Sequence, residues 1–396
     1  MKRANIILAI VLLVTVVPWG CNHSVNQSDD IITVDVTESY PKKELILQDF
    51  MDVEYIPLET TNEFVCQGIV LAVGKEVIIV KNQINDGNLY IFDRNGKGLR
   101  KINRKGNGGE EYSSISSITL DEDNNEMFIS SFSKLLVYDL FGNFKRSLPF
   151  REESSYSSIC NYDKENLICF NRSFDKKEIP DKSPFFIISK QDGSIIKDIS
   201  IICQQKIPDI KRINHNGFII NAYGSNSPEI SIIPYQDSWI LTLYSSDTVF
   251  RYLPDQSMIP LMVRTPSIES KDAESFFSPV ILTERYFFLQ TMKIEPEVKG
   301  TTPQDAYLFY PKTHLMFDRQ EKTIYEYSVL NNDFSNVKVE IMQKNGNEKI
   351  AFWQKIEADY LVESLEKGEL KNKLKEIVTK LDEEDNPVIM LVKHKE

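Results

Sequence analysis

Two stretches of the chain repeat one pattern, "IFDRNGKGLRKI" at residues 91–102 and "VYDLFGNFKRSL" at residues 137–148. The copies begin 46 residues apart (137 against 91), and each places an aromatic residue and Asp before a glycine and basic residues. Apolar runs on both sides of such a glycine predict a strand, a tight turn and a return strand. A third copy, "IISKQDGSIIKDI", spans residues 187–199, and a looser one, "TVFRYLPDQSMIPLMV", spans residues 248–263.

A second set of hairpins alternates with the first. Five segments place a polar turn between two apolar runs, with the turns near residues 75, 123, 164, 237 and 284. Two hairpins make a four-stranded unit, and four strands in a period of about 40 to 50 residues are typical of a β-propeller blade. "MDVEYIPLE" and "NPVIMLVK", near the two ends of the chain, can together supply a closing blade. The long gap before the fourth hairpin predicts an insertion within residues 200–227.

The sequence therefore predicts an all-β fold: a six-bladed β-propeller of four-stranded antiparallel blades, with a short C-terminal helical segment. We assign residues 45–346 to the propeller and residues 347–396 to the helical segment and a closing strand. Within 347–382, apolar residues recur at helical spacing in two sets separated by Gly368, with Lys and Glu on the other face. This pattern predicts two helices that pack on the propeller, and a dimerising helix is the alternative.

The charge balance excludes one broad class of function. The 396 residues include 46 Lys plus Arg against 58 Asp plus Glu, a formal net charge of −12. Nucleic-acid binding draws its affinity from cationic contacts to phosphate, so we expect no nucleic-acid partner. His23, His215, His314 and His394 are scattered and no CxxC occurs, so we expect neither a metal site nor a cofactor.

The N-terminus predicts export. Lys2 and Arg3 precede an apolar run from Ile6 to Val17, which is short for a membrane span and suits a signal peptide over residues 1–20. Cys21 follows Gly20, as in bacterial lipoprotein signals, and we predict that Cys21 carries a lipid anchor. An ordinary signal peptide with an incidental cysteine is the alternative. Residues 21–44 read as a polar tether and a first strand. The expected location is the cell envelope, as an outer-membrane lipoprotein facing the periplasm or the surface.

The stretch "RKGNGGEEYSSI" at 104–115 raises the question of a phosphate-binding loop. Such a loop needs a following helix, whereas "EEYSSISSITL" predicts a strand, and two glutamates repel phosphate. We interpret the stretch as the crossover between two blades. If a binding site lies at this crossover, Arg104, Glu111 and Tyr112 are the candidate residues, and solvent-facing loop residues are the alternative.

The hairpin "SICNYDKENLICF" contains Cys160 and Cys169. With "DKEN" as a four-residue turn, the two cysteines face each other. A cross-strand disulfide is allowed in an exported protein, but directly opposed cysteines make strained bridges, so two buried thiols are the expected state.

The chain resembles the six-bladed β-propeller lipoproteins of Bacteroides-type bacteria. The resemblance rests on "DVEYIPLETT" (52–61), "IFDRNGKGLRKINRKGNGGEEYSSI" (91–115), "VYDLFGNF" (137–144), "DTVFRY" (247–252) and "DNPVIMLVKHK" (385–395). Where that family usually has Gly-Pro-Gly-Glu-Tyr, this chain lacks the proline at residues 108–112. The resemblance implies a fold and an envelope location and no settled activity.

These observations favour a non-enzymatic, envelope-anchored propeller that binds a ligand, such as a glycan, or a partner protein on its loops or central opening. The alternative is a carbohydrate-active lyase or hydrolase with its site in the central channel. No nucleophile or catalytic motif appears in the sequence. Acidic residues at 120–129 fit a hairpin turn better than a calcium loop. Trp239 and Trp353 can stack on a sugar, but core positions are expected for both.

Overall fold

The first three blades are regular four-stranded meanders. The computed structural model describes residues 31–132, 134–151, 156–171, 183–203, 210–215, 218–223, 231–302, 305–335, 337–342, 347 and 349–395. Blade 1 contains β4 (Ile69–Val73), β5 (Val77–Lys81), β6 (Asn88–Asp93) and β7 (Gly98–Asn103). Blade 2 contains β8 (Ser117–Asp121), the 3-10 turn η1 (Glu122–Asn124), β9 (Glu126–Ser131), β10 (Lys134–Asp139) and β11 (Phe144–Pro149). Blade 3 contains β12 (Tyr156–Asn161), β13 (Asn166–Asn171), β14 (Phe185–Ser189) and β15 (Ile195–Ile199).

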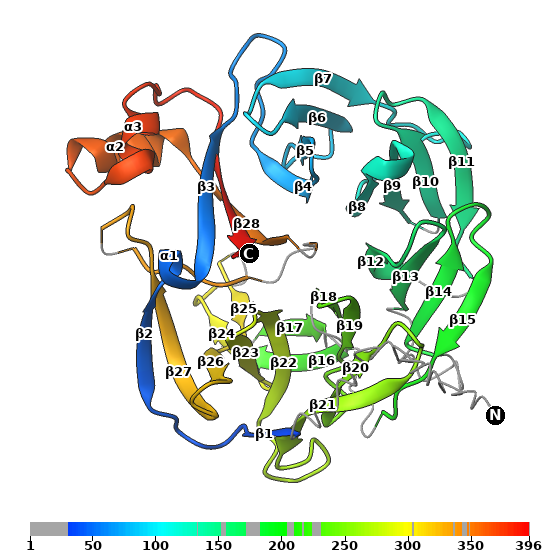
Figure 1. The fold of residues 1–396 in the computed structure, drawn as a ribbon, viewed down its shortest axis with the longest axis vertical. Helices are drawn as coiled ribbons and strands as arrows, with labels where there is room; N and C mark the ends of the chain where they lie inside the picture. The colour runs from blue at the N-terminus through cyan, green and yellow to red at the C-terminus, as the bar shows by residue number, and fades with distance from the viewer. Residues whose placement is uncertain are drawn as a thin grey trace, which may run out of the picture. The chain divides into compact units, whose positions relative to one another are not determined.

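The next two blades each gain a fifth strand from the N-terminal part of the chain. Blade 4 contains β18 (Ile232–Tyr235), β19 (Ser238–Leu241), β20 (Thr248–Tyr252), β21 (Met258–Thr265) and, parallel to β21, β1 (Ile32–Asp35). Blade 5 contains β22 (Ser275–Leu282), β23 (Tyr286–Lys293), β26 (Lys312–Asp318), β27 (Thr323–Leu330) and, parallel to β27, β2 (Lys42–Ile46). We call β1, β2 and the short helix α1 (Leu47–Phe50) the strap, because this segment runs along the outer edges of two blades (Figure 1).

The last blade joins the two ends of the chain. Blade 6 contains β28 (Ile350–Ile356), β29 (Val388–His394) and β3 (Met51–Pro57). β29 pairs with β28 and β3, and its pairing with β3 runs from Val388 opposite Pro57 to His394 opposite Met51. The ring of six sheets is therefore closed by hydrogen bonds between residues near opposite ends of the sequence, as the sequence predicts.

The first strands of the blades surround the axis. β28, β4, β8, β12, β18 and β22 contact one another in this order, at the centre of the ring in Figure 1. Each blade is buried on both faces: Ile78 and Val80 pack against blade 6, whereas Val77 and Ile79 pack against blade 2. This two-sided burial explains why strands such as "VIIV" read as continuous apolar runs rather than as an alternation.

Two further hairpins extend from the ring. β16 (Ile210–His215) and β17 (Phe218–Tyr223) form a separate two-stranded sheet between blades 3 and 4, within the range predicted for an insertion. β24 (Glu297–Lys299) and β25 (Tyr307–Phe309) form another hairpin in the connection from β23 to β26. The sequence did not indicate this second insertion.

The C-terminal helices are shorter than predicted. The helices are α2 (Ala358–Glu366) and α3 (Asn372–Val378), and Gly368 lies between them. Leu361, Leu374 and Val378 pack into the core between blades 5 and 6. The prediction of a helix from residue 347 is wrong, because residues 350–356 form strand β28. A short apolar run buried on both faces has no periodicity that separates strand from helix.

Candidate functional site

One face of the ring gathers a turn from each of five blades. In an antiparallel meander, the turn between first and second strands emerges at the same end in every blade. We call this end the inner-turn face. Its turns lie between β4 and β5, β8 and β9, β12 and β13, β18 and β19, and β22 and β23. All five lie where the sequence predicts them. Two pockets open on this face and share Pro234.

The larger pocket lies at the end of the central channel. It has a volume of about 730 Å³, and we call it the channel-mouth pocket. Its lining comes from the ends of the innermost strands β4, β8, β12, β18 and β28, together with the first turns of blades 1 and 2. Five of the six blades therefore contribute to one concave surface, as is usual for ligand sites in propellers.

An aromatic wall forms one side of the channel-mouth pocket. The rings of Tyr162 and Trp239 stack with centroids 6.2 Å apart and an interplanar angle of 28°. Both side chains line the pocket and are partly exposed. Tyr252, which is 1% exposed, packs behind them. A tyrosine hydroxyl is protonated at neutral pH, and burial raises the pKa of Tyr162 further, so this group can donate a hydrogen bond.

A buried ion pair fixes the first acidic residue of the pocket. Lys190 Nζ lies 2.6 Å from Asp121 Oδ2, and the side chains are 6% and 7% exposed. Lys190 also donates to the carbonyl oxygen of Asp163 at 2.7 Å. Asp121 in addition accepts a hydrogen bond from the Asn124 side chain at 2.8 Å. The Asp121 carboxylate therefore links blades 2 and 3 by satisfied contacts.

The next two acidic residues hold blade 2 against blade 1. The Glu122 carboxylate accepts hydrogen bonds from backbone amides of residues 75–77 in the first turn of blade 1. Asp123 Oδ1 lies 2.8 Å from Lys75 Nζ, and that hydrogen bond holds the pKa of Asp123 below its ordinary value. These acids serve as inter-blade links, which leaves none of the three as an evident general acid or base.

A cationic wall faces the aromatic one. Arg94 Nη2 lies 3.2 Å and Lys393 Nζ 3.5 Å from the same oxygen of Glu54. Arg94 Nη1 also donates to the carbonyl oxygen of Gly74 at 2.8 Å. Lys349, which is exposed, lines the pocket beside them. Among the described residues, no group of three His, Cys, Asp or Glu could hold a metal ion.

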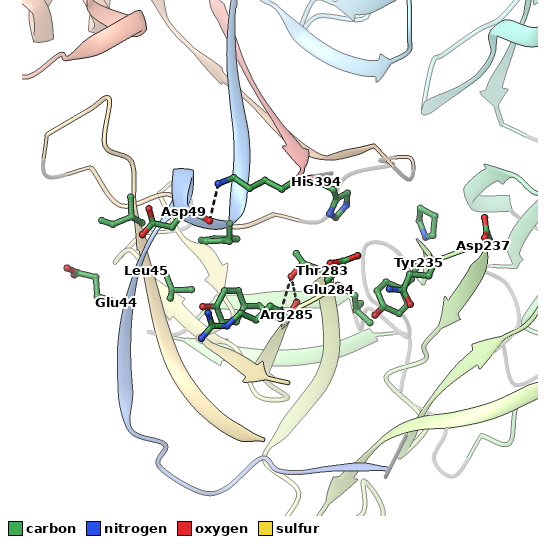
Figure 2. A pocket seen from close by; sticks show the side chains of 16 residues that line it. Glu44, Leu45, Asp49, Tyr235, Asp237, Thr283, Glu284, Arg285 and His394 are labelled. Carbon is green, nitrogen blue, oxygen red and sulfur yellow. Dashed lines mark hydrogen bonds between the residues drawn. The ribbon is translucent and has the colours of Figure 1, made fainter. Parts of the chain in front are cut away.

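The second pocket lies between the strap and blades 4 to 6. It has a volume of about 640 Å³, and we call it the strap pocket (Figure 2). Four of its carboxylates are exposed, those of Glu44, Asp49, Asp237 and Glu284. Figure 2 shows that they come from the strap and from the turns of blades 4 and 5.

Two cations of the strap pocket, Lys395 and Arg285, form contacts that stabilise the fold. Lys395 Nζ donates to the carbonyl oxygens of Gln48 at 2.7 Å and Asp49 at 3.1 Å, so the end of the chain holds the strap. Arg285 Nη2 lies 3.1 Å from Asp318, a fully buried carboxylate that also contacts Lys43 of β2 at 3.1 Å. The strap is thus tied to blade 5 through Asp318.

A family model covers nearly all of the chain from residue 31 onward. The model of a domain of unknown function, DUF4934, matches residues 31–393. The chain belongs to this family. No curated protein matches the sequence.

One solved structure shares the fold, and two others are more distant. A protein from Bacteroides fragilis assigned as exported is 16% identical, with a TM-score of 0.61 over 92% of this chain and 100% of that chain. A Bacteroides caccae protein of unknown function has a TM-score of 0.36 at 8% identity, over 72% of this chain and 81% of that chain. A streptogramin B lyase has a TM-score of 0.35 at 8% identity, over 72% of this chain and 94% of that chain.

The crossover residues predicted as a binding site make internal contacts in this DUF4934 member. Tyr112 is 1% exposed; its hydroxyl donates to the carbonyl oxygen of Gly87 at 2.8 Å and accepts from the backbone amide of Arg104 at 2.9 Å. Arg104 Nε donates to the carbonyl oxygen of Gly142 in the next blade, and Glu111 caps the amide of Gly108. A binding role for Arg104, Glu111 and Tyr112 stays a prediction, and neither pocket includes them.

Cys160 and Cys169 are free, buried thiols. The predicted register is wrong by one residue, because Cys160 lies opposite Ile168. The hairpin loop has three residues rather than four: the backbone N–H of Tyr162 donates to the carbonyl oxygen of Asn166, and the Asp163 carboxylate accepts hydrogen bonds from the loop amides. The two thiols consequently pack into different cores. Burial raises the pKa of Cys160 to about 12. Cys21 and the predicted signal peptide lie outside the described residues.

Sequence reasoning missed Trp239 as a pocket residue. Trp353 is in the core at 4% exposed, as expected, but Trp239 is partly exposed and lines the channel mouth. A signal was present: Trp239 and Tyr162 both stand beside the turn of an inner hairpin. Positions beside those turns lie at the channel end in any propeller, so aromatic residues there indicate a pocket wall rather than core.

Proposed function

We propose that this chain is an exported, non-enzymatic propeller that binds a glycan in its channel-mouth pocket. One observation carries the proposal: a stacked, partly exposed pair of aromatic rings, Tyr162 and Trp239, forms a wall of a concave pocket at the channel end. A flat aromatic surface in a pocket with a few polar groups matches the apolar face and hydroxyl rim of a sugar ring.

Location is part of the same proposal. The chain is held at the cell envelope by a lipid on Cys21, outside the cytoplasm. None of the described helices is long and apolar enough to cross a membrane. The similar Bacteroides fragilis protein is assigned as exported. Mass spectrometry of the mature N-terminus tests the anchor: a lipid-modified Cys21 is expected, and a mature chain with an unmodified Cys21 contradicts it.

Binding is favoured over catalysis by the state of the pocket's acids. Sugar hydrolysis uses a pair of carboxyl groups at a defined separation across the scissile bond. Here the Asp121 carboxylate is held by Lys190, and Glu122 caps backbone amides of the neighbouring blade. Carboxylates committed in this way position the walls of the pocket and do not reach toward a substrate.

The test is calorimetric titration of the full mature chain with a panel of neutral and acidic oligosaccharides. Saturable binding of at least one glycan is expected. Trp239→Ala should weaken that binding at least tenfold, which corresponds to about 1.4 kcal/mol. Trp239→Phe keeps an aromatic ring and should lose less affinity for the glycan. Retained binding by this variant would show that substitution at residue 239 does not simply unfold the protein.

The matched control is Phe141→Ala. Phe141 is 63% exposed and stacks on Arg100 outside both pockets, so its loss should leave the affinity unchanged. If no oligosaccharide of the panel binds, glycan binding is overturned, and a protein partner becomes the favoured ligand. Equal weakening by Trp239→Ala and Phe141→Ala would mean that the glycan binds elsewhere.

A further inference from the structure

The cationic wall of the channel-mouth pocket has fewer carboxylates than cations. Arg94 and Lys393 share one oxygen of Glu54, at 3.2 and 3.5 Å. A single carboxylate balances one positive charge, so these three side chains together carry one net positive charge. Arg94 Nε is buried and, among the described residues, has no hydrogen-bond partner. The side chain of Lys393 is 40% exposed, and it lines the pocket.

Two of the pocket's three acids are paired with other cations. Asp121 is paired with the buried Lys190, and Asp123 with Lys75. Glu122 keeps its negative charge, because its hydrogen-bond donors are the neutral backbone amides of residues 75–77, and these bonds hold it at the link between blades 1 and 2. Two neighbouring cations that share one carboxylate stand out in a chain whose formal net charge is −12. A local field of opposite sign to the rest of a protein attracts ligands of that protein's own charge sign into one place.

The two walls lie across the ring from each other. Tyr162 and Trp239 belong to blades 3 and 4, and Arg94 and Lys393 belong to blades 1 and 6. In a closed ring of six, blades 3 and 4 stand opposite blades 6 and 1. A sugar ring stacked on the aromatic wall would therefore direct its far substituents toward the cationic wall.

We propose that the ligand of the channel-mouth pocket is an acidic glycan, a uronic-acid oligosaccharide whose carboxylate binds Lys393 and Arg94. This inference rests on the proposed function. A carboxylate of the ligand supplies the second negative charge beside Glu54. It accepts charge-assisted hydrogen bonds from the Lys393 ammonium and the Arg94 guanidinium groups. Neutral sugars make the aromatic contact alone and bind more weakly.

The experiment compares uronate oligosaccharides with their methyl esters, which keep the ring and remove the charge. A galacturonate tetrasaccharide and a glucuronate-containing tetrasaccharide serve as probes, each beside its ester. We expect at least one acid to bind about tenfold more tightly than its ester, with an affinity that falls as salt is raised.

Lys393→Gln and Lys395→Gln form a matched pair, because the two lysines stand at the same end of the chain and line different pockets. Lys393→Gln should weaken binding of the acid about fivefold to tenfold and leave the ester within about twofold. Lys395→Gln should leave both within about twofold, since it removes the same charge from the strap pocket.

The outcomes separate this inference from the proposed function. Equal binding of acid and ester, with both weakened by Trp239→Ala, overturns the acidic ligand and leaves glycan binding intact. Equal effects of Lys393→Gln and Lys395→Gln overturn the assignment to the cationic wall, since general charge then explains the preference. If neither acid binds, the inference fails, and the neutral members of the panel decide the proposed function by themselves.

Discussion

The channel-mouth pocket and the strap pocket open on one face and share Pro234, yet the fold engages their charged side chains differently. At the channel mouth, the acids hold neighbouring blades together, and two cations, Arg94 and Lys393, share one carboxylate. At the strap pocket, Lys395 and Arg285 hold the strap and blade 5, and four carboxylates are exposed. The charge that each pocket presents to a ligand therefore depends on which side chains form contacts within the fold. Inventories of charged residues alone would not distinguish the two.

The largest effect is expected at the buried ion pair of the channel mouth. Lys190→Met leaves Asp121 buried without its cation, and removing one partner of such a pair costs about 3 to 5 kcal/mol. The free energy of unfolding from urea titration checks this. Lys164→Met, at an exposed position of the adjacent turn, is the control and should change stability little. A loss below about 1 kcal/mol for Lys190→Met would show that the pair does not hold blades 2 and 3.

At the strap, the corresponding effect is smaller and depends on pH. Burial raises the pKa of Asp318, but hydrogen bonds from Arg285 and Lys43 lower this pKa by a larger amount. The pKa of Asp318 therefore lies below its ordinary value. Because the folded pKa is the lower one, the stabilisation is complete above the unfolded pKa of about 3.9 and is lost as the pH falls through the folded value.

Asp318→Asn should therefore cost about 1.5 to 3 kcal/mol at neutral pH, the range for hydrogen bonds to charged groups. Its unfolding free energy should also change less than that of the wild type between pH 5 and pH 2. Parallel pH profiles for the two proteins would contradict the role given to Asp318. Limited proteolysis in the strap would report whether the loss is local to β2.

A smaller effect is expected from His394 at the edge of the strap pocket. Burial lowers its pKa, so the folded state favours the neutral ring. The associated stabilisation is complete above the unfolded pKa of about 6.5 and declines as the pH falls through the lower folded value. His394→Gln should flatten the stability profile between pH 7 and pH 5. An unchanged slope in thermal melts over that range would contradict a buried neutral ring.

Most of the fold could be predicted from the sequence, because turn residues and apolar runs repeat with a regular period. The glycine turns, the five inner hairpins, the closing blade and the first insertion all follow from that pattern. The apolar run at 350–356 led to the wrong prediction of a helix, because burial on both faces removes the alternation of apolar and polar residues that marks a strand. The register at Cys160 depended on a single residue of loop length, which the Asp163 side chain decides.

The candidate site was less accessible to prediction. Glycine-rich sequence drew attention to Arg104 and Tyr112, whereas the pockets are lined by residues that are remote in sequence and meet only in the closed ring. Tyr162 and Trp239 come from neighbouring blades, and Lys393 faces Arg94 only because β29 pairs beside β3. Charge partners such as Lys190 and Asp121, 69 positions apart, have no local signature.

The most direct test of the account is hydrogen–deuterium exchange of the mature chain with and without the glycan of highest affinity from the panel. The account predicts slower exchange in the turns and strand ends around Lys75, Tyr162, Trp239 and Lys393, with no change in the strap or at the crossover 104–112. Protection confined to the strap or to that crossover would contradict the central claim that the channel mouth is the binding site.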